Sequence, residues 1–206
     1  LQQQGFDYCY DKRLYDRLRE GHARPVRDHL RAGLDYQSKL ARFLENHDEP
    51  RAAATFTEEV HRAAAVITYL SPGLRFFHQG QLEGRLKRIS PHLVRAPIEP
   101  VNDRLRRFYD RLLATLRHEV VRRGEWRQLD CVPAWSGNGS FENFVASEWR
   151  GSQGERLLSC INFSSNTGQC FIRFGDDAFR QQKWQLMDCV SDAVYDRDGD
   201  DLYSRG

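Results

Sequence analysis

The 206-residue chain is 40% hydrophobic and 12% aromatic, a composition that supports a packed core and argues against intrinsic disorder. Its 31 basic and 29 acidic residues nearly balance, and no apolar run approaches the roughly 20 residues of a membrane-spanning helix, so we expect neither a nucleic-acid nor a membrane partner. Because the five cysteines lack zinc-binding spacing and no secretory signal opens the chain, we expect a cytoplasmic protein with reduced thiols and no metal or other cofactor.

Short apolar segments alternate with helical periodicity up to Gly124. Strand-like segments lie at residues 5–10, 39–44 and 74–78, and helical patterns lie at 12–19, 25–31, 57–69 and 102–122. Thr57 and Asn102 are placed to cap the last two helices, and Gly124 is placed to end the last one. Strands that alternate with helices form parallel sheets, so we predict a three-stranded parallel sheet that is either a small open sheet or the last part of a barrel.

The pattern changes after Gly124. Five strand-like segments, separated by clusters of Gly, Asn, Ser and Asp, lie at residues 126–132, 144–149, 156–163, 168–174 and 184–190. This spacing is typical of an antiparallel β domain, so we predict an α/β region of residues 1–124 followed by an all-β region of residues 125–206. Cys160 and Cys170 flank one of the turns, where the expected compartment favours reduced thiols. The acidic segment 196–200 is expected to be a solvated turn.

The densest polar cluster directly follows the second predicted strand. It runs from Glu45 to Arg51 as Glu-Asn-His-Asp-Glu-Pro-Arg. In parallel α/β proteins, functional groups gather at the carboxyl ends of the strands, and a His flanked by Asn and Asp at such an end is a candidate site. The equally favoured alternative is that the acidic residues of this cluster only cap the next helix or face solvent.

Two further strand ends carry aromatic or polar groups. Along residues 5–11, alternation places Phe6, Tyr8 and Tyr10 on one face, and we favour core aromatics followed by Asp11 as a helix cap. The third strand closes on residues 78–81 (His-Gln-Gly-Gln), where the glycine permits a positive-φ turn. A ligand contact from this turn and turn chemistry alone are equally favoured.

Two segments, together with the order of the two regions, resemble the α-amylase family, glycoside hydrolase family 13. Phe43-Leu44-Glu45-Asn46-His47-Asp48 resembles the family's fourth conserved segment at the end of barrel strand seven, with Glu45 where many members carry Asp. Residues 73–80 (Gly-Leu-Arg-Phe-Phe-His-Gln-Gly) are similar to the strand-eight segment. The resemblance covers essentially the whole chain. It implies the last three βα units of a (β/α)8 TIM barrel in residues 1–124 and a C-terminal β-sandwich domain in residues 125–206.

This resemblance implies a retaining glycosidase or transglycosylase that acts on an α-glucan or oligosaccharide. Asp48 matches the family's third carboxylate, which holds sugar hydroxyls and favours the distorted transition state. His47 matches the histidine that binds the same sugar. Asn46, Glu49 and Arg51 are expected to complete the substrate-binding loop.

The family's nucleophile and general-acid segments have no counterpart in these 206 residues. The resemblance therefore implies a fragment that is inactive alone and needs the remainder of the barrel as its partner. Any calcium requirement of the full-length protein is left open. The alternative is a non-catalytic, family-like protein that serves in carbohydrate binding or assembly.

Overall fold

Three short parallel strands form the centre of the first region. The computed structural model describes all 206 residues, and its first sheet has the order β1-β2-β3 with both neighbouring pairs parallel, as predicted. The strands are β1 (Cys9–Tyr10), β2 (Leu40–Arg42) and β3 (Leu74–Arg75). Each is shorter than its apolar segment, because strand length depends on the neighbour available for pairing, and only two residue pairs join each neighbouring pair of strands.

Seven helices accompany this sheet, and the sequence predicted the capping of the longer ones. They are α1 (Lys12–Glu20), α2 (Ala23–Leu30), α3 (Leu34–Gln37), α4 (Ala52–Thr55), α5 (Glu58–Leu70), α6 (Asp103–Thr115) and α7 (Glu119–Arg123). The side chains of Asp11, Thr57 and Asn102 accept backbone N–H groups at the starts of α1, α5 and α6, respectively, which confirms these three caps. Each cap is a local interaction, so the sequence alone predicts it well.

The predicted helix over residues 102–122 is wrong in one respect, because the structure breaks it into α6 and α7. At the end of α6 the Thr115 hydroxyl donates to the Arg111 carbonyl. The chain then tightens, and the N–H groups of Arg117 and His118 bond to carbonyls three residues earlier. Such tightening is common at helix ends, and it separates α6 from α7, which packs against β5 and β6.

The region after Gly124 contains the predicted antiparallel strands. They are β4 (Glu125–Val132), β5 (Phe144–Arg150), β6 (Arg156–Asn162) and β7 (Phe171–Arg173), in the sheet order β6-β5-β4-β7, followed by a separate hairpin of β8 (Lys183–Met187) and β9 (Val194–Asp198). A final helix, α8 (Gly199–Ser204), ends the chain's regular structure, and 3-10 turns lie at residues 2–4, 140–143 and 177–179. The packing of a two-sheet sandwich stays a prediction.

The predicted turn at residues 196–200 is wrong. Residues up to Asp198 pair with β8, and the Asp198 side chain accepts the backbone N–H groups of Asp200 and Asp201 to begin α8. The sequence of β9 does not predict a strand because all of its side chains are exposed and it has no apolar face. Its pairing with β8 holds it in place.

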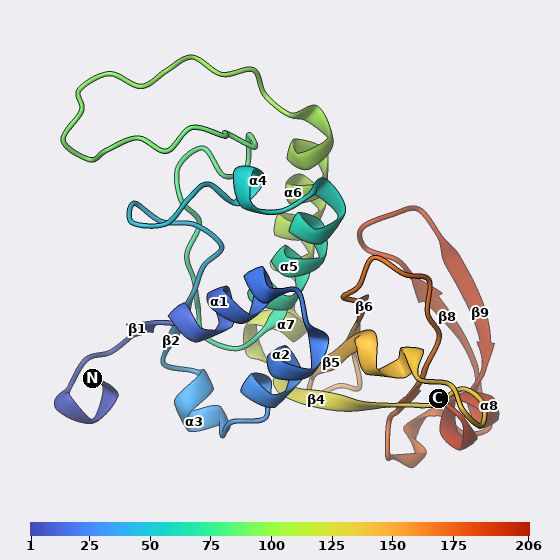
Figure 1. The fold of residues 1–206 in the computed structure, drawn as a ribbon. Helices are drawn as coiled ribbons and strands as arrows, with labels where there is room; N and C mark the ends of the chain where they lie inside the picture. Colours follow the sequence, from blue (N-terminus) through green and yellow to red (C-terminus); the bar gives the residue numbers. More distant parts are fainter.

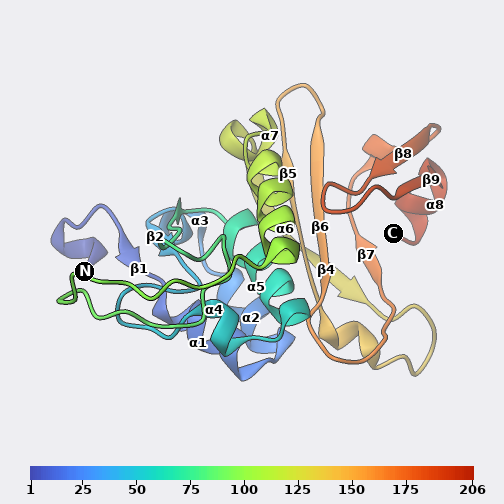
Figure 2. The same ribbon diagram turned by 90° about the horizontal axis from the view of Figure 1, so that it is seen from above.

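The two regions share one apolar core. Figure 2 shows α5, α6 and α7 between the parallel strands and the antiparallel sheet. A cluster of 25 buried residues joins the helices of the first region, α5, α6 and α7 among them, to strands β4, β5 and β6 of the antiparallel sheet. The indole N–H of Trp149 on β5 donates to the carbonyl of Leu70 at the end of α5, at 2.7 Å. Each region therefore packs directly on the other.

None of the helices combines the length and hydropathy needed to span a bilayer.

The expected core aromatics on β1 are wrong. Phe6, Tyr8 and Tyr10 are all exposed, because the first two precede β1 and β1 itself is an edge strand that pairs only with β2. The Tyr10 ring meets the edges of Phe43 and Phe76 at centroid distances of 5.3 and 5.8 Å. Tyr10 therefore packs against two other aromatic rings although half of its surface is exposed.

Candidate functional site

The exits of all three parallel strands meet at one edge of the sheet. The chain leaves β2 through the buried residues Phe43 and Leu44 and then forms the loop of residues 45–51. Glu45 in this loop lies 3.3 Å from the ring of His78, which follows β3. Glu49 lies 3.2 Å from the ammonium of Lys12, which follows β1. The loop therefore occupies the carboxyl edge of the sheet, where parallel α/β proteins place their ligands.

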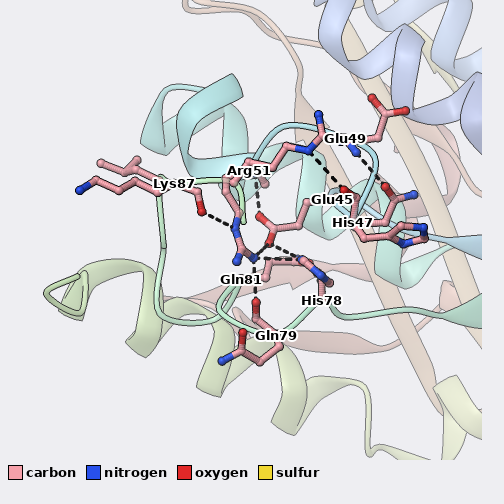
Figure 3. A network of polar contacts seen from close by, with 12 residues as sticks. Glu45, His47, Glu49, Arg51, His78, Gln79, Gln81 and Lys87 are labelled. Atoms are coloured by element: carbon pink, nitrogen blue, oxygen red, sulfur yellow. Dashed lines mark hydrogen bonds and ion pairs between the residues drawn. The ribbon is translucent and has the colours of Figure 1, made fainter. Parts of the chain in front are cut away.

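A buried ion pair holds the base of this loop. The Glu45 carboxylate has no exposed surface, and its Oε1 accepts from Arg51 Nη1 at 2.6 Å. Its other oxygen, Oε2, accepts the backbone N–H of Ala52 at 2.7 Å, at the start of α4 (Figure 3). Because both carboxylate oxygens are satisfied within the chain, Glu45 closes the loop on itself.

Arg51 extends this network to the next segment. Its Nη1 also donates to the Gln79 carbonyl at 2.7 Å and lies 3.0 Å from Nδ1 of His78, while its Nε donates to the Lys87 carbonyl at 3.1 Å (Figure 3). Lys87 belongs to the long connection between β3 and α6, the wide green loop of Figure 1. One guanidinium therefore joins the loop after β2 to two parts of the chain after β3.

Asn46 shapes the exposed part of the loop. Its side-chain oxygen accepts the backbone N–H groups of Asp48 and Glu49, both at 2.9 Å. This arrangement is an Asx turn, in which a short polar side chain replaces a backbone acceptor. The turn leaves the side chain of His47 directed away from Arg51 (Figure 3).

His47 and Asp48 are the loop's exposed polar side chains. They are 52% and 72% exposed, respectively, and His47 Nε2 lies 3.3 Å from Asp48 Oδ2. The backbone carbonyl of His47 accepts from Arg88 at 3.2 Å, which anchors the main chain while the side chains stay available. An exposed carboxylate beside an imidazole can accept hydrogen bonds from hydroxyl groups and stabilise nearby positive charge.

The five residues singled out from the sequence thus divide into two groups. Asn46 and Arg51 are buried and bonded to the protein, and Glu49 is paired with Lys12, so these three hold the loop's shape. His47 and Asp48 face outward from the same loop. Sequence reasoning missed Glu45 as the partner of Arg51, and the signal available was a carboxylate that directly follows a buried apolar run.

The turn after β3 rests on a buried polar network. Gly80 has a φ of 92°, so the positive-φ turn is confirmed. The side chain of Gln81 accepts the His78 N–H at 3.4 Å and donates to the hydroxyls of Tyr69 and Tyr109 at 2.7 and 2.9 Å. The Tyr109 hydroxyl in turn lies 2.7 Å from Nε2 of His61. The edge of the site is therefore tied to helices α5 and α6.

Burial sets the ionisation of this network. Burial raises the pKa of Tyr69 and Tyr109 well above the usual tyrosine range. Burial also lowers the pKa of His61 from 6.5 to about 4, so the imidazole is neutral near pH 7. The Tyr109 hydroxyl accepts from Gln81 and shares a hydrogen bond with His61 Nε2, whereas Nδ1 of His61 has no hydrogen-bond partner.

A second buried network surrounds Arg42 of β2. Asp11 contacts His29 at 2.9 Å and pairs with the fully buried guanidinium of Arg42, which also bonds to Gln37. Burial opposes ionisation of Asp11, but the His29 hydrogen bond and the Arg42 charge outweigh it and lower the pKa of this carboxyl. Both partners of Asp11 are buried, so this carboxylate stabilises the fold.

No group of three or more His, Cys, Asp or Glu side chains is arranged to hold a metal ion.

No protein-family model and no curated protein matches the chain. Among solved structures, the chain is similar to the crystal structure of a noncanonic maltogenic α-amylase, AmyB, from Thermotoga neapolitana, with a TM-score of 0.77 at 20% sequence identity. The similarity covers 94% of this chain and 46% of that chain, so this chain spans about half the length of the solved protein. Similarity at this level of identity shows the fold, and the chain has an amylase-like fold.

Proposed function

We propose that the chain is the C-terminal part of an α-amylase-type retaining glycosidase or transglycosylase that acts on α-glucans. Residues 1–124 would supply the last three βα units of the barrel, and residues 125–206 the C-terminal β domain. The amylase-like fold supports this proposal, as does the Asn-His-Asp segment at the exit of the central parallel strand. Further strands of the barrel would pair with the two open edges of the sheet, at β1 and β3.

The observation that carries the proposal is the exposed carboxylate of Asp48 where three strand exits meet. In this mechanism Asp48 accepts hydrogen bonds from hydroxyls of one sugar ring and balances the positive charge that develops on that ring. His47 binds the same sugar. Because these contacts strengthen as the ring distorts, they stabilise the transition state more than the substrate.

The remaining loop residues position this pair. The Glu45–Arg51 ion pair and the Asn46 turn hold the backbone on both sides of His47 and Asp48. Catalytic constellations need such support, because errors of about half an ångström already reduce the benefit of a placed group. Asn46 and Arg51 therefore act on the substrate through Asp48 rather than by contact.

A nucleophile and a general acid must come from the remainder of the barrel. Within this chain, three carboxylates at the ends of the strands are each paired with a cation: Glu45 with Arg51, Glu49 with Lys12, and Asp11 with Arg42. This pairing also favours a second candidate, a non-catalytic protein of the same fold that binds carbohydrate or serves in assembly. The upstream coding sequence separates the two. The enzyme requires an Asp after a Gly-Phe-Arg-x segment and a Glu at the end of the following strand.

The direct test compares the full-length protein with its Asp48→Asn variant on α-1,4-linked maltooligosaccharides. We expect kcat to fall at least about a hundredfold, while oligosaccharide binding persists, because the lost charge acts mainly in the transition state. An Asp35→Asn variant, altered at an exposed carboxylate on α3, serves as the control and keeps full activity. Near-normal turnover by Asp48→Asn would remove the proposed mechanism.

A further inference from the structure

Three cysteines lie on one face of the antiparallel sheet. Cys160 on β6 is opposite Ala146 on β5, and Ala146 is opposite Leu129 on β4, two residues before Cys131. Directly opposed residues, and residues two apart in a strand, point to the same side of a sheet. Cys131 and Cys160 therefore share a face, with the small side chain of Ala146 between their strands.

Cys170 brings the three thiols together. It precedes β7 and lies two residues before Ile172, which pairs with Cys131, so it extends over the same face. Its thiol lies near enough to those of Cys131 and Cys160 for the three groups to influence one another's ionisation. All three are free cysteines. We call Cys131, Cys160 and Cys170 the thiol cluster.

Accessibility differs within the thiol cluster. Cys160 is exposed, whereas Cys131 and Cys170 are partly buried. A reagent from solution therefore meets Cys160 first, with the less exposed Cys170 on the same face of the sheet. Neighbouring free thiols of unequal exposure are suited to thiol–disulfide exchange, in which an exposed thiol reacts first and a second thiol completes the reaction.

We propose that the thiol cluster is a thiol–disulfide exchange site, in which Cys160 reacts with a small disulfide such as oxidised glutathione and Cys170 completes the reaction. The Cys160 thiolate attacks one sulfur of oxidised glutathione, which breaks the glutathione disulfide and releases one glutathione thiolate. That thiolate takes up the proton that Cys160 lost. The product of this first step is a mixed disulfide on Cys160.

The second step is attack by the thiolate of Cys170 on the sulfur of Cys160. A Cys160–Cys170 disulfide forms, the mixed disulfide breaks, and the second glutathione leaves with the proton from Cys170. Two protein thiols are oxidised and one glutathione disulfide is reduced to two thiols, so atoms and electrons balance. The bond ties the connection between β6 and β7 to the edge of the sheet.

The electrostatics of the cluster agree with this order. A hydrogen bond from the Cys170 thiol lowers the pKa of Cys160 below its usual value. The contact with Cys131 lowers the pKa of Cys170. The hydrogen bond to Cys160 and burial outweigh this effect and raise the pKa of Cys170 to about 12. The exposed member is thus the most readily ionised, and thiolates are the nucleophiles in this chemistry.

Peptide mapping tests the proposal, because trypsin separates the relevant thiols. Cys160 and Cys170 share one tryptic peptide, residues 157–173, whereas Cys131 lies in residues 128–150. After treatment of the protein with oxidised glutathione and alkylation of the remaining thiols, we expect peptide 157–173 to be two hydrogens lighter and free of glutathione. The Cys170→Ser variant should retain glutathione on Cys160, and a Cys189→Ser control should behave like the wild type.

The wild-type map alone can overturn the proposal, whether or not the variants fold. Glutathione that stays on Cys160 while Cys170 is alkylated would show that Cys170 does not complete the reaction. A cross-link between the two peptides would make Cys131 the partner instead. Equal modification of Cys160 and the exposed Cys189 would show that the cluster confers no special reactivity.

Discussion

The buried imidazole of His61 makes the stability of the fold depend on pH in a defined window. Its pKa is lowered by burial to about 4 in the folded protein, against 6.5 for an unfolded histidine. Below pH 6.5 the unfolded chain therefore binds a proton that the folded chain rejects, and folding stability falls as the pH is lowered. The loss ends near pH 4, where both states are protonated.

These two values set the size of the effect. Over the whole window they correspond to about 3 kcal/mol, and to about 2 kcal/mol between neutral pH and roughly pH 5. The ionised Asp11 carboxyl also contributes folding stability that is lost in acid. Because its pKa is lowered below the usual value of 3.8, this loss occurs at a lower pH than the loss caused by His61. The two contributions are therefore separable.

Urea unfolding of the wild type and a His61→Gln variant, at neutral pH and near pH 5, measures this contribution. Glutamine keeps a hydrogen-bonding group toward Tyr109 but does not titrate, so we expect the variant to lack about 2 kcal/mol of the wild-type decrease, whatever its stability at neutral pH. His92→Gln, altered at an exposed histidine, is the matched control and should follow the wild type. Identical pH dependence of the wild type and His61→Gln would refute the reasoning.

Two further predictions concern the loop and the junction of the two regions. Arg51→Met leaves the buried Glu45 carboxylate without its cation and should lower the free energy of unfolding in urea by about 3–5 kcal/mol. The double variant with Glu45→Gln should lose clearly less stability than the sum of the two single variants. Additive losses would contradict the coupling of the two residues. Gly124→Ala should destabilise by about 2 kcal/mol or more, because its methyl group would lie 2.2 and 2.5 Å from two backbone oxygens, while Gly139→Ala, which meets nothing within 4 Å, should change stability little.

The helices could be predicted from the sequence because their determinants are local. Thr57 and Asn102 cap α5 and α6 through N–H groups only two or three residues away, and both helices begin where the sequence indicates. Strands depend on partners distant in sequence. β3 retains only two paired residues of its apolar segment, and β9 forms although its acidic sequence favours a turn.

The sequence predicts where the candidate site lies, but not which of its side chains are exposed and which are buried. Position after a buried strand identifies the loop of residues 45–51, since parallel strands direct their exits to one edge. Which carboxylate faces outward depends on where cations lie in three dimensions. Glu45 and Asp48 are three residues apart and chemically alike, yet Arg51 and the Ala52 N–H bury the first and leave the second exposed.

The energetics of the loop argue that the exposure of Asp48 is specified rather than incidental. A buried ion pair such as Glu45–Arg51 gains little net stability, because removing both charges from water costs several kcal/mol. A loop that only connected β2 to α4 could close with apolar side chains at lower cost. What the pair adds is a single geometry, since Arg51 joins three chain segments through directed hydrogen bonds. A fixed base beneath two exposed side chains, His47 and Asp48, is consistent with the proposed contact of this pair with a sugar.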